Sequence, residues 1–348
     1  MNPIAIYSGS LVIYWSAMVI ALGIAAGFFL SLSLHLSDGG RASAMWVFLP
    51  IATVLSVFFS RLMHWYCHLE QYGGFVAAMT DYSVGAFCLA GVLLGVSLGA
   101  WIVKLMGLCE TRGELLDAVA PGLSLTIALV RLSALFNSSC RSKIIINSKL
   151  LQRLPIGSEL TSASGVVEYR FATFFVQFIL MMIVTILLVR FWARRRNYPM
   201  KGNEPEFGHV SRLFLVLYAV PEVVFDSTRY DSSFFHFTFI KYLNRYMGFV
   251  SFTQMISGFI VLALIIHYSR ASIRANGFKW YHIVLWVTFA LTLVGVGVSE
   301  YMVQRHGDWY LGCYGAMSLS CAVMILTVWL LYLSCCDSDA AEEAEEFD

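Results

Sequence analysis

Long apolar runs constrain this chain more than any other feature of its sequence. A membrane-spanning helix needs about 20 mostly apolar residues, and 59% of the 348 residues are apolar while only 13% are charged. Soluble domains carry about 25% charged residues, so a soluble fold is excluded. The sequence predicts an all-α, polytopic membrane bundle of about nine helices. They are expected at residues 11–34, 44–63, 84–106, 118–137, 171–192, 213–228, 248–268, 281–298 and 311–333.

The charge balance and the missing motifs exclude several classes of function. The chain has 23 basic and 22 acidic residues. It therefore has no excess of positive charge of the kind that binds nucleic acid. The eight cysteines form no CxxC pair, and His64 and His68 have no fixed third ligand, so no metal site is expected. There is no Walker loop, dinucleotide-binding glycine fingerprint or GxSxG motif, so no cofactor is expected either.

Lysine and arginine residues in the loops indicate the orientation. Basic residues flank the loops after the first, third, fifth and seventh runs, whereas residues 64–83 contain none. Because cytoplasmic loops carry the positive charge, we expect the N-terminus outside and the acidic tail inside. The start of the chain lacks a basic leader region, so we expect an uncleaved first helix.

The loop after the fourth run breaks this pattern with several basic residues on the expected outer side. Two explanations of these basic residues stay open. The loop is an exception to a statistical rule, or it contacts anionic lipid headgroups. The residues are Arg141, Lys143, Lys149, Arg153 and Arg170.

Charged residues inside the apolar runs mark a candidate site. Arg131 lies in the fourth run, where burial costs roughly 2.5–3.5 kcal/mol unless the charge is paired or reaches water. Glu222, Asp226 and Arg229 follow an i, i+4, i+7 spacing and share one helix face. This face is either a structural ion-pair network or the wall of a polar cavity. Arg61, near the end of the second run, could extend to the membrane interface.

Glycines in the third run predict close helix packing. Gly91, Gly95 and Gly99 recur every four residues and so lie on one side of the helix. Small residues at this spacing let another helix approach closely. Packing is favoured over direct contact with lipid.

Five short segments give the chain a likeness to a known family. In order, they read IYWSAMVIALG, SRLMHWY, DAVAPGLSLTIALVRLSALFNSS, LFLVLYAVPEVVFDSTR and SFTQMIS, between residue 11 and about residue 269. This order resembles the prolipoprotein diacylglyceryl transferase family, including its DxxAP…GRxGNFxNGE signature. The matching residues are Trp15, Gly23, Arg61, Asp117, Ala120, Pro121, Arg131, Asn137, Tyr218, Asp226, Arg229, Gln254 and Ser257.

The resemblance implies a fold, a reaction and a set of site residues. It implies a seven-helix domain over 1–270, two additional helices over 271–335 and an acidic cytoplasmic tail over 336–348, in the bacterial cytoplasmic membrane. The implied reaction moves a diacylglyceryl group from phosphatidylglycerol, or another anionic phospholipid, to the lipobox cysteine that follows a prolipoprotein signal peptide, releasing glycerol phosphate. The expected catalytic residues are Arg131, Tyr218, Glu222 and Asp226, and the expected substrate-binding residues are Arg61, Asn137, Arg229, Gln254, Trp15 and Gly91.

Departures from the family pattern keep other functions open. The second arginine of the family falls on Glu222, and the family's HGG histidine falls on Ala90. Arg229 or Arg170 could supply the missing positive charge. One alternative is a non-catalytic or repurposed member that binds lipid, and another is a small polytopic transporter. The transfer reaction requires that Arg131 opens toward the bilayer and is not sealed in a dry ion pair.

Overall fold

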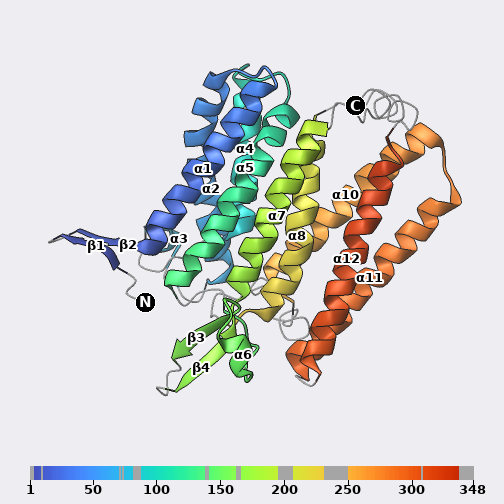
Figure 1. Ribbon diagram of the computed structural model, residues 1–348. Helices are drawn as coiled ribbons and strands as arrows, with labels where there is room; N and C mark the ends of the chain where they lie inside the picture. Colours follow the sequence, from blue (N-terminus) through green and yellow to red (C-terminus); the bar gives the residue numbers. More distant parts are fainter. Residues whose placement is uncertain are drawn as a thin grey trace.

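The computed structural model describes most of the chain as long helices (Figure 1). The described residues are 4–8, 11–69, 72, 74–80, 88–137, 141–161, 166–194, 207–230, 250–306 and 309–336. Within them, each expected apolar run has a helix. The long helices are α1 (Trp15–Ser37), α2 (Ala42–Cys67), α4 (Leu89–Leu105), α5 (Arg112–Ser133), α7 (Thr173–Arg194), α8 (His209–Thr228), α10 (Phe252–Asn276), α11 (Trp280–Arg305) and α12 (Tyr310–Leu333).

Seven helices of the described residues are long and apolar enough to cross a membrane, and α4 is a shorter apolar helix. The prediction of a polytopic membrane bundle is therefore confirmed. Helix α8 spans 20 residues but carries Arg212, Glu222 and Asp226, which lowers its hydropathy. It is a mostly apolar helix with three charged side chains, and none of its residues is exposed.

The first expected helix begins later than its apolar run indicated. Residues Ile4–Ser8 and Leu11–Tyr14 form strands β1 and β2 of an antiparallel hairpin, and α1 begins only at Trp15. The cause is local, because β-branched Ile and Val side chains favour strands. The start at residue 11 was wrong by the length of β2.

Helix α5 also differs from its expected bounds, because it begins with polar residues at Arg112. The side chain of Thr111 accepts a hydrogen bond from the backbone N–H of Glu114, which is a typical N-cap. At its other end the helix tightens into a 3₁₀ turn, η1 (Ala134–Phe136). A hydropathy window cannot detect a polar first turn.

Shorter elements gather at one end of the bundle. They include α3 (Phe75–Thr80), α6 (Lys149–Gln152) and the antiparallel hairpin of β3 (Gly157–Thr161) and β4 (Val167–Phe171). We call this the hairpin end; α5 and α8 finish there and α10 begins there (Figure 1). Helices α1, α4 and α7 finish at the opposite end (Figure 1).

The glycines of α4 bring two helices into backbone contact, as the sequence predicted. A Cβ atom added to Gly91 would overlap the backbone of Ser60 in α2, and one added to Gly95 would overlap that of Ser56. The hydroxyl of Ser60 donates to the carbonyl of Cys88 at 2.8 Å. Helices α2 and α4 therefore pack as one close pair.

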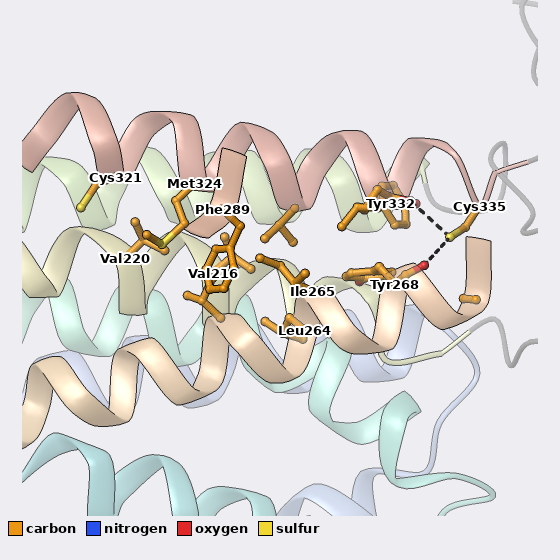
Figure 2. Packing of buried hydrophobic residues seen from close by; sticks show 14 residues of the cluster. Val216, Val220, Leu264, Ile265, Tyr268, Phe289, Cys321, Met324, Tyr332 and Cys335 are labelled. Carbon is orange, nitrogen blue, oxygen red and sulfur yellow. Dashed lines mark hydrogen bonds between the residues drawn. The ribbon is translucent and has the colours of Figure 1, made fainter. Parts of the chain in front are cut away.

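The last two helices share an apolar cluster with α8 and α10 (Figure 2). Val216 of α8 and Ile265 of α10 are buried against Phe289 of α11 and Met324 of α12. At one edge of the cluster, the Cys335 thiol donates to the Tyr268 carbonyl at 3.5 Å. Helix α12 thus packs directly on α8 and α10, and α11 packs mainly on α12.

We predict that Gly91→Ala lowers stability whereas Gly258→Ala does not. The added methyl group at Gly91 meets backbone atoms, and such overpacking costs about 1–3 kcal/mol. Gly258 in α10 has no atom within 4 Å of an added Cβ, so alanine there is neutral or slightly stabilising. Thermal unfolding of the purified protein in detergent measures both variants. Equal unfolding temperatures would contradict the packing described for α2 and α4.

Candidate functional site

An ion pair between α5 and α8 forms the centre of the candidate site. The Arg131 Nη2 atom lies 2.6 Å from Oε1 of Glu222, and the two side chains are 13% and 7% exposed. Gln177 of α7 donates to the other carboxylate oxygen of Glu222 at 3.1 Å. The prediction that Arg131 has a partner is confirmed, and that partner is Glu222, where the resemblance expects the family's second arginine.

Tyr218 completes this centre one helical turn before Glu222. With Arg131, Gln177 and Glu222 it lines a hollow of only about 10 Å³. A cavity of this size holds about one water molecule. The Tyr218 ring is buried and stacks on Phe214 at 5.9 Å between ring centroids. The hollow is therefore closed to a lipid headgroup in this conformation.

A second group of polar residues surrounds Asp226, one turn after Glu222. Asp226 is fully buried, accepts a hydrogen bond from the Ser251 hydroxyl and lies 3.6 Å from the Arg229 guanidinium. Ser251 caps α10 in a reciprocal capping box with Gln254. The side-chain amide of Gln254 also donates to the Val223 carbonyl at 3.2 Å. Gln254 thus ties the start of α10 to the end of α8.

The last two helices add polar groups that the sequence interpretation missed. Glu300 of α11 is 2% exposed and accepts a hydrogen bond from Gln304 at 3.0 Å. The Tyr314 hydroxyl of α12 donates to the Ser227 carbonyl at 3.3 Å. The expected eighth helix ended at residue 298, so Glu300 was counted as a loop residue. Had the helix been extended past residue 298, Glu300 would have been recognised as a charged residue within a membrane helix and so as a candidate site residue.

Lys143 connects the hairpin-end loop to this network. Its Nζ atom donates to Gln304 Oε1 at 2.9 Å. Burial lowers the pKa of the Lys143 amine, while the carboxylates of Glu300 and Asp226 act in the opposite direction. This basic residue of the expected outer loop therefore binds a side chain of α11 at the protein surface.

Arg170 of β4 is likewise paired within the protein. It forms a 2.6 Å ion pair with Glu168, and its guanidinium lies 3.6 Å from the centre of the Tyr230 ring. At the hairpin end, Arg131, Arg170 and Arg229 therefore each face a carboxylate. Neither Arg170 nor Arg229 offers an unpaired charge in place of the missing family arginine.

The other expected site residues lie around this centre but do not enter the hollow. Arg61 is 2% exposed and donates to the Ala78 carbonyl at 2.7 Å, so the expectation that it extends to the interface was wrong. Trp15 is 42% exposed and stacks on Phe136 at 6.1 Å. Asn137 is exposed after η1, and Gly91 faces α2.

One residue of the resemblance lies at the opposite end of the bundle. The Asp117 carboxylate is fully buried and accepts backbone hydrogen bonds from Gly208 at 2.7 Å and Ser211 at 2.8 Å. A carboxylate at a helix N-terminus satisfies otherwise unpaired N–H groups. Asp117 therefore anchors the start of α8 to α5.

We predict strong coupling between Arg131 and Glu222 in protein stability. Arg131→Met or Glu222→Leu alone leaves a buried charge without its partner, which costs about 3–5 kcal/mol. The double variant removes both charges and is expected to be more stable than either single variant. Unfolding in detergent measures this cycle, with exposed Arg270→Met as the control. Additive effects of the two substitutions would show that the charges do not interact.

Comparison with known proteins connects this geometry to a family. Residues 3–270 match the family model described as prolipoprotein diacylglyceryl transferase. Two curated relatives from strains of Dehalococcoides mccartyi, both named phosphatidylglycerol–prolipoprotein diacylglyceryl transferase, are 28% identical over 142 residues. That stretch covers 40% of this chain and 53% of each relative, so the chain spans about half the length of the curated relatives it matches. Since the family model covers well over half of the sequence, the chain belongs to the prolipoprotein diacylglyceryl transferase family.

Proposed function

We propose that this multi-pass membrane protein transfers a diacylglyceryl group from phosphatidylglycerol to the lipobox cysteine of an exported prolipoprotein. The observation that carries the proposal is that Arg131 stays 13% exposed beside Glu222, so that an anion-binding group and a proton acceptor lie together in a member of a transferase family. The reaction requires this ion pair to open. The protein would lie in the bacterial cytoplasmic membrane with its hairpin end and N-terminus outside and its C-terminus inside.

Arg131 would hold the phosphate of the lipid. A guanidinium stays charged inside a membrane protein and binds phosphate oxygens through two parallel N–H donors. Its charge would also stabilise the glycerol phosphate that leaves, and such donors act most strongly where water is excluded. The 13% exposure of Arg131 supports an approach of lipid from the side of the bundle.

Glu222 would act both as the resting partner of Arg131 and as the base. When a lipid phosphate displaces the carboxylate from Arg131, Glu222 becomes free to accept the thiol proton of the prolipoprotein cysteine. The thiolate sulfur then forms a bond to the glyceryl carbon, and the bond from that carbon to the phosphate oxygen breaks. Glycerol phosphate leaves, and the product is a thioether.

The remaining residues would position these two. Tyr218 lines the same hollow and could orient the headgroup, while Asp226 with Arg229 and Gln254 holds the end of α8 in place. Arg61, Asn137, Trp15 and Gly91 would contact substrate only after local rearrangement. The proposed division is a catalytic domain over 1–270 with helices added over 271–335. Of the tail, residues 337–348 lie outside the described residues.

A rescue experiment tests the reaction. The full chain is produced in a bacterium depleted of its own transferase, and modification of a lipoprotein cysteine is measured by mass spectrometry. We expect modified acceptor with the wild type and at least about a hundredfold less with Arg131→Ala or Glu222→Gln, since an anion-stabilising donor or a general base contributes this much. Glu110→Gln, an exposed carboxylate at the opposite end, serves as the control. Inserted wild-type protein that modifies no acceptor would refute the proposal.

A specific observation favours a second candidate, a non-catalytic family member that binds lipid. Arg131, Arg170 and Arg229 each have a carboxylate partner, and the hollow beside Arg131 holds only about 10 Å³. Arginines paired in this way offer a phosphate no uncompensated charge. Under this hypothesis the polar residues of the hairpin end form a closed core. The transfer activity was then lost when Glu222 replaced the family's second arginine.

The substitution Glu222→Arg separates the two candidates. It removes the proposed base and restores the positive charge that the family resemblance expects at this position. If Glu222 is the base, the variant is expected to lose the transfer activity of the wild type. If the chain is non-catalytic, the wild type is inactive and the variant gains phosphatidylglycerol binding. Retention of lipid after purification and modification of the acceptor, measured on the same preparations, distinguish these outcomes.

A further inference from the structure

A cavity of about 520 Å³ lies at the opposite end of the bundle from Arg131, between α7, α8, α10 and α12. Its α7 wall consists of Leu187, Arg190, Phe191 and Arg194, spaced i, i+3, i+4, i+7 on one helix face. The two apolar residues alternate with two arginines toward the end of the helix. Leu187 is 46% exposed, so this wall opens toward the surrounding lipid.

The facing walls repeat this gradient from apolar to cationic. On α8, Val216 and Leu213 lead to Arg212, whose Nη1 atom lies 3.4 Å from His209 Nδ1. On α12, Ile325 and other apolar side chains line the cavity. The interior of the cavity is therefore apolar, while its cations collect at the end of the bundle.

Aromatic rings form the floor near that end. The Phe191 ring lies 6.0 Å from the Trp329 ring and 5.7 Å from the Tyr332 ring, measured between centroids. Tyr332 also contacts Tyr268 edge to face (Figure 2). Aromatic side chains with one polar edge are enriched where the apolar interior of a membrane meets its headgroups.

Two of the three arginines keep their charge available. Arg190 and Arg194 are exposed, and neither pairs with a carboxylate among the residues that the structure describes. This differs from the hairpin end, where Arg131, Arg170 and Arg229 are all neutralised. An anionic group at the mouth of the cavity would therefore meet uncompensated positive charge.

We propose that this cavity binds one anionic phospholipid, with an acyl chain between α7 and α12 and its phosphate at Arg190, Arg194 and Arg212. The volume is in the range of ordinary ligand sites, and juxtamembrane arginines attract anionic headgroups. The site needs α12, which lies beyond the matched residues 3–270. The added helices thus create a lipid site that is separate from the proposed transfer site.

The chain's own acidic tail is the competing occupant, because residues 337–348 follow α12 and include seven acidic side chains, five of them after residue 340. The tail offers one large apolar residue, Phe347, against an apolar cavity formed by four helices. An acyl chain matches that interior better, because burial of apolar surface drives association in proportion to its area.

Photocrosslinking tests the proposal on the full chain in vesicles of phosphatidylcholine. The probe is phosphatidylglycerol with a diazirine on one acyl chain, and the control probe is phosphatidylcholine with the same diazirine. Mass spectrometry locates the labelled residues. We expect the anionic probe to label α12 at Ile325 or Trp329 and the neutral probe to label it much less. The variant Arg190→Gln/Arg194→Gln is expected to lower labelling by roughly tenfold, since each cation contributes to headgroup attraction.

A matched double variant at the same end, Arg270→Gln/Arg274→Gln, is expected to leave the labelling unchanged. Neither residue lines the cavity, so this control removes the same charge from the end of the bundle. Equal labelling by both probes, or equal loss in both double variants, would overturn the proposal. Strong labelling only after removal of residues 337–348 would also overturn it and would assign the cavity to the tail.

Discussion

The contact between Arg131 and Glu222 determines the state of the hairpin end. A charged group inside a membrane is costly unless it is paired and hydrogen-bonded. The 2.6 Å ion pair and the hydrogen bond from Gln177 satisfy the Glu222 carboxylate from two helices, α5 and α7. Helices α5, α7 and α8 are therefore joined by polar contacts near the hairpin end.

The same contact limits the chemistry available to the site. A phosphate can reach Arg131 only by displacing a carboxylate, and the hollow beside it has space for about one water. The site is closed while Arg131 and Glu222 are paired, and the proposed reaction requires that they separate. The proposed transferase and the proposed non-catalytic member differ only in whether the pair opens when a lipid arrives.

Three arginines at the hairpin end and two at the opposite end differ in their surroundings. At the hairpin end, arginines from α5, β4 and the end of α8 each meet a carboxylate. At the opposite end, Arg190 and Arg194 are exposed beside an apolar cavity. The added helices contribute to both ends, since α11 brings Glu300 next to Ser227 and α12 forms a wall of the cavity. Helix α12 is therefore part of the packing around α8.

The sequence by itself determined the helices, because spanning lipid demands about 20 apolar residues with locally satisfied backbone hydrogen bonds. It also determined that Arg131 needs a partner and that Gly91 faces another helix. Only the tertiary structure decided which residues meet. The partner of Arg131 lies 91 positions away, Arg61 turns inward to Ala78, and Gln177 and Glu300 join the network from other helices. Periodicity and hydropathy describe each helix separately. The pairing of buried charges depends instead on which helices are neighbours and on how each helix is rotated about its axis.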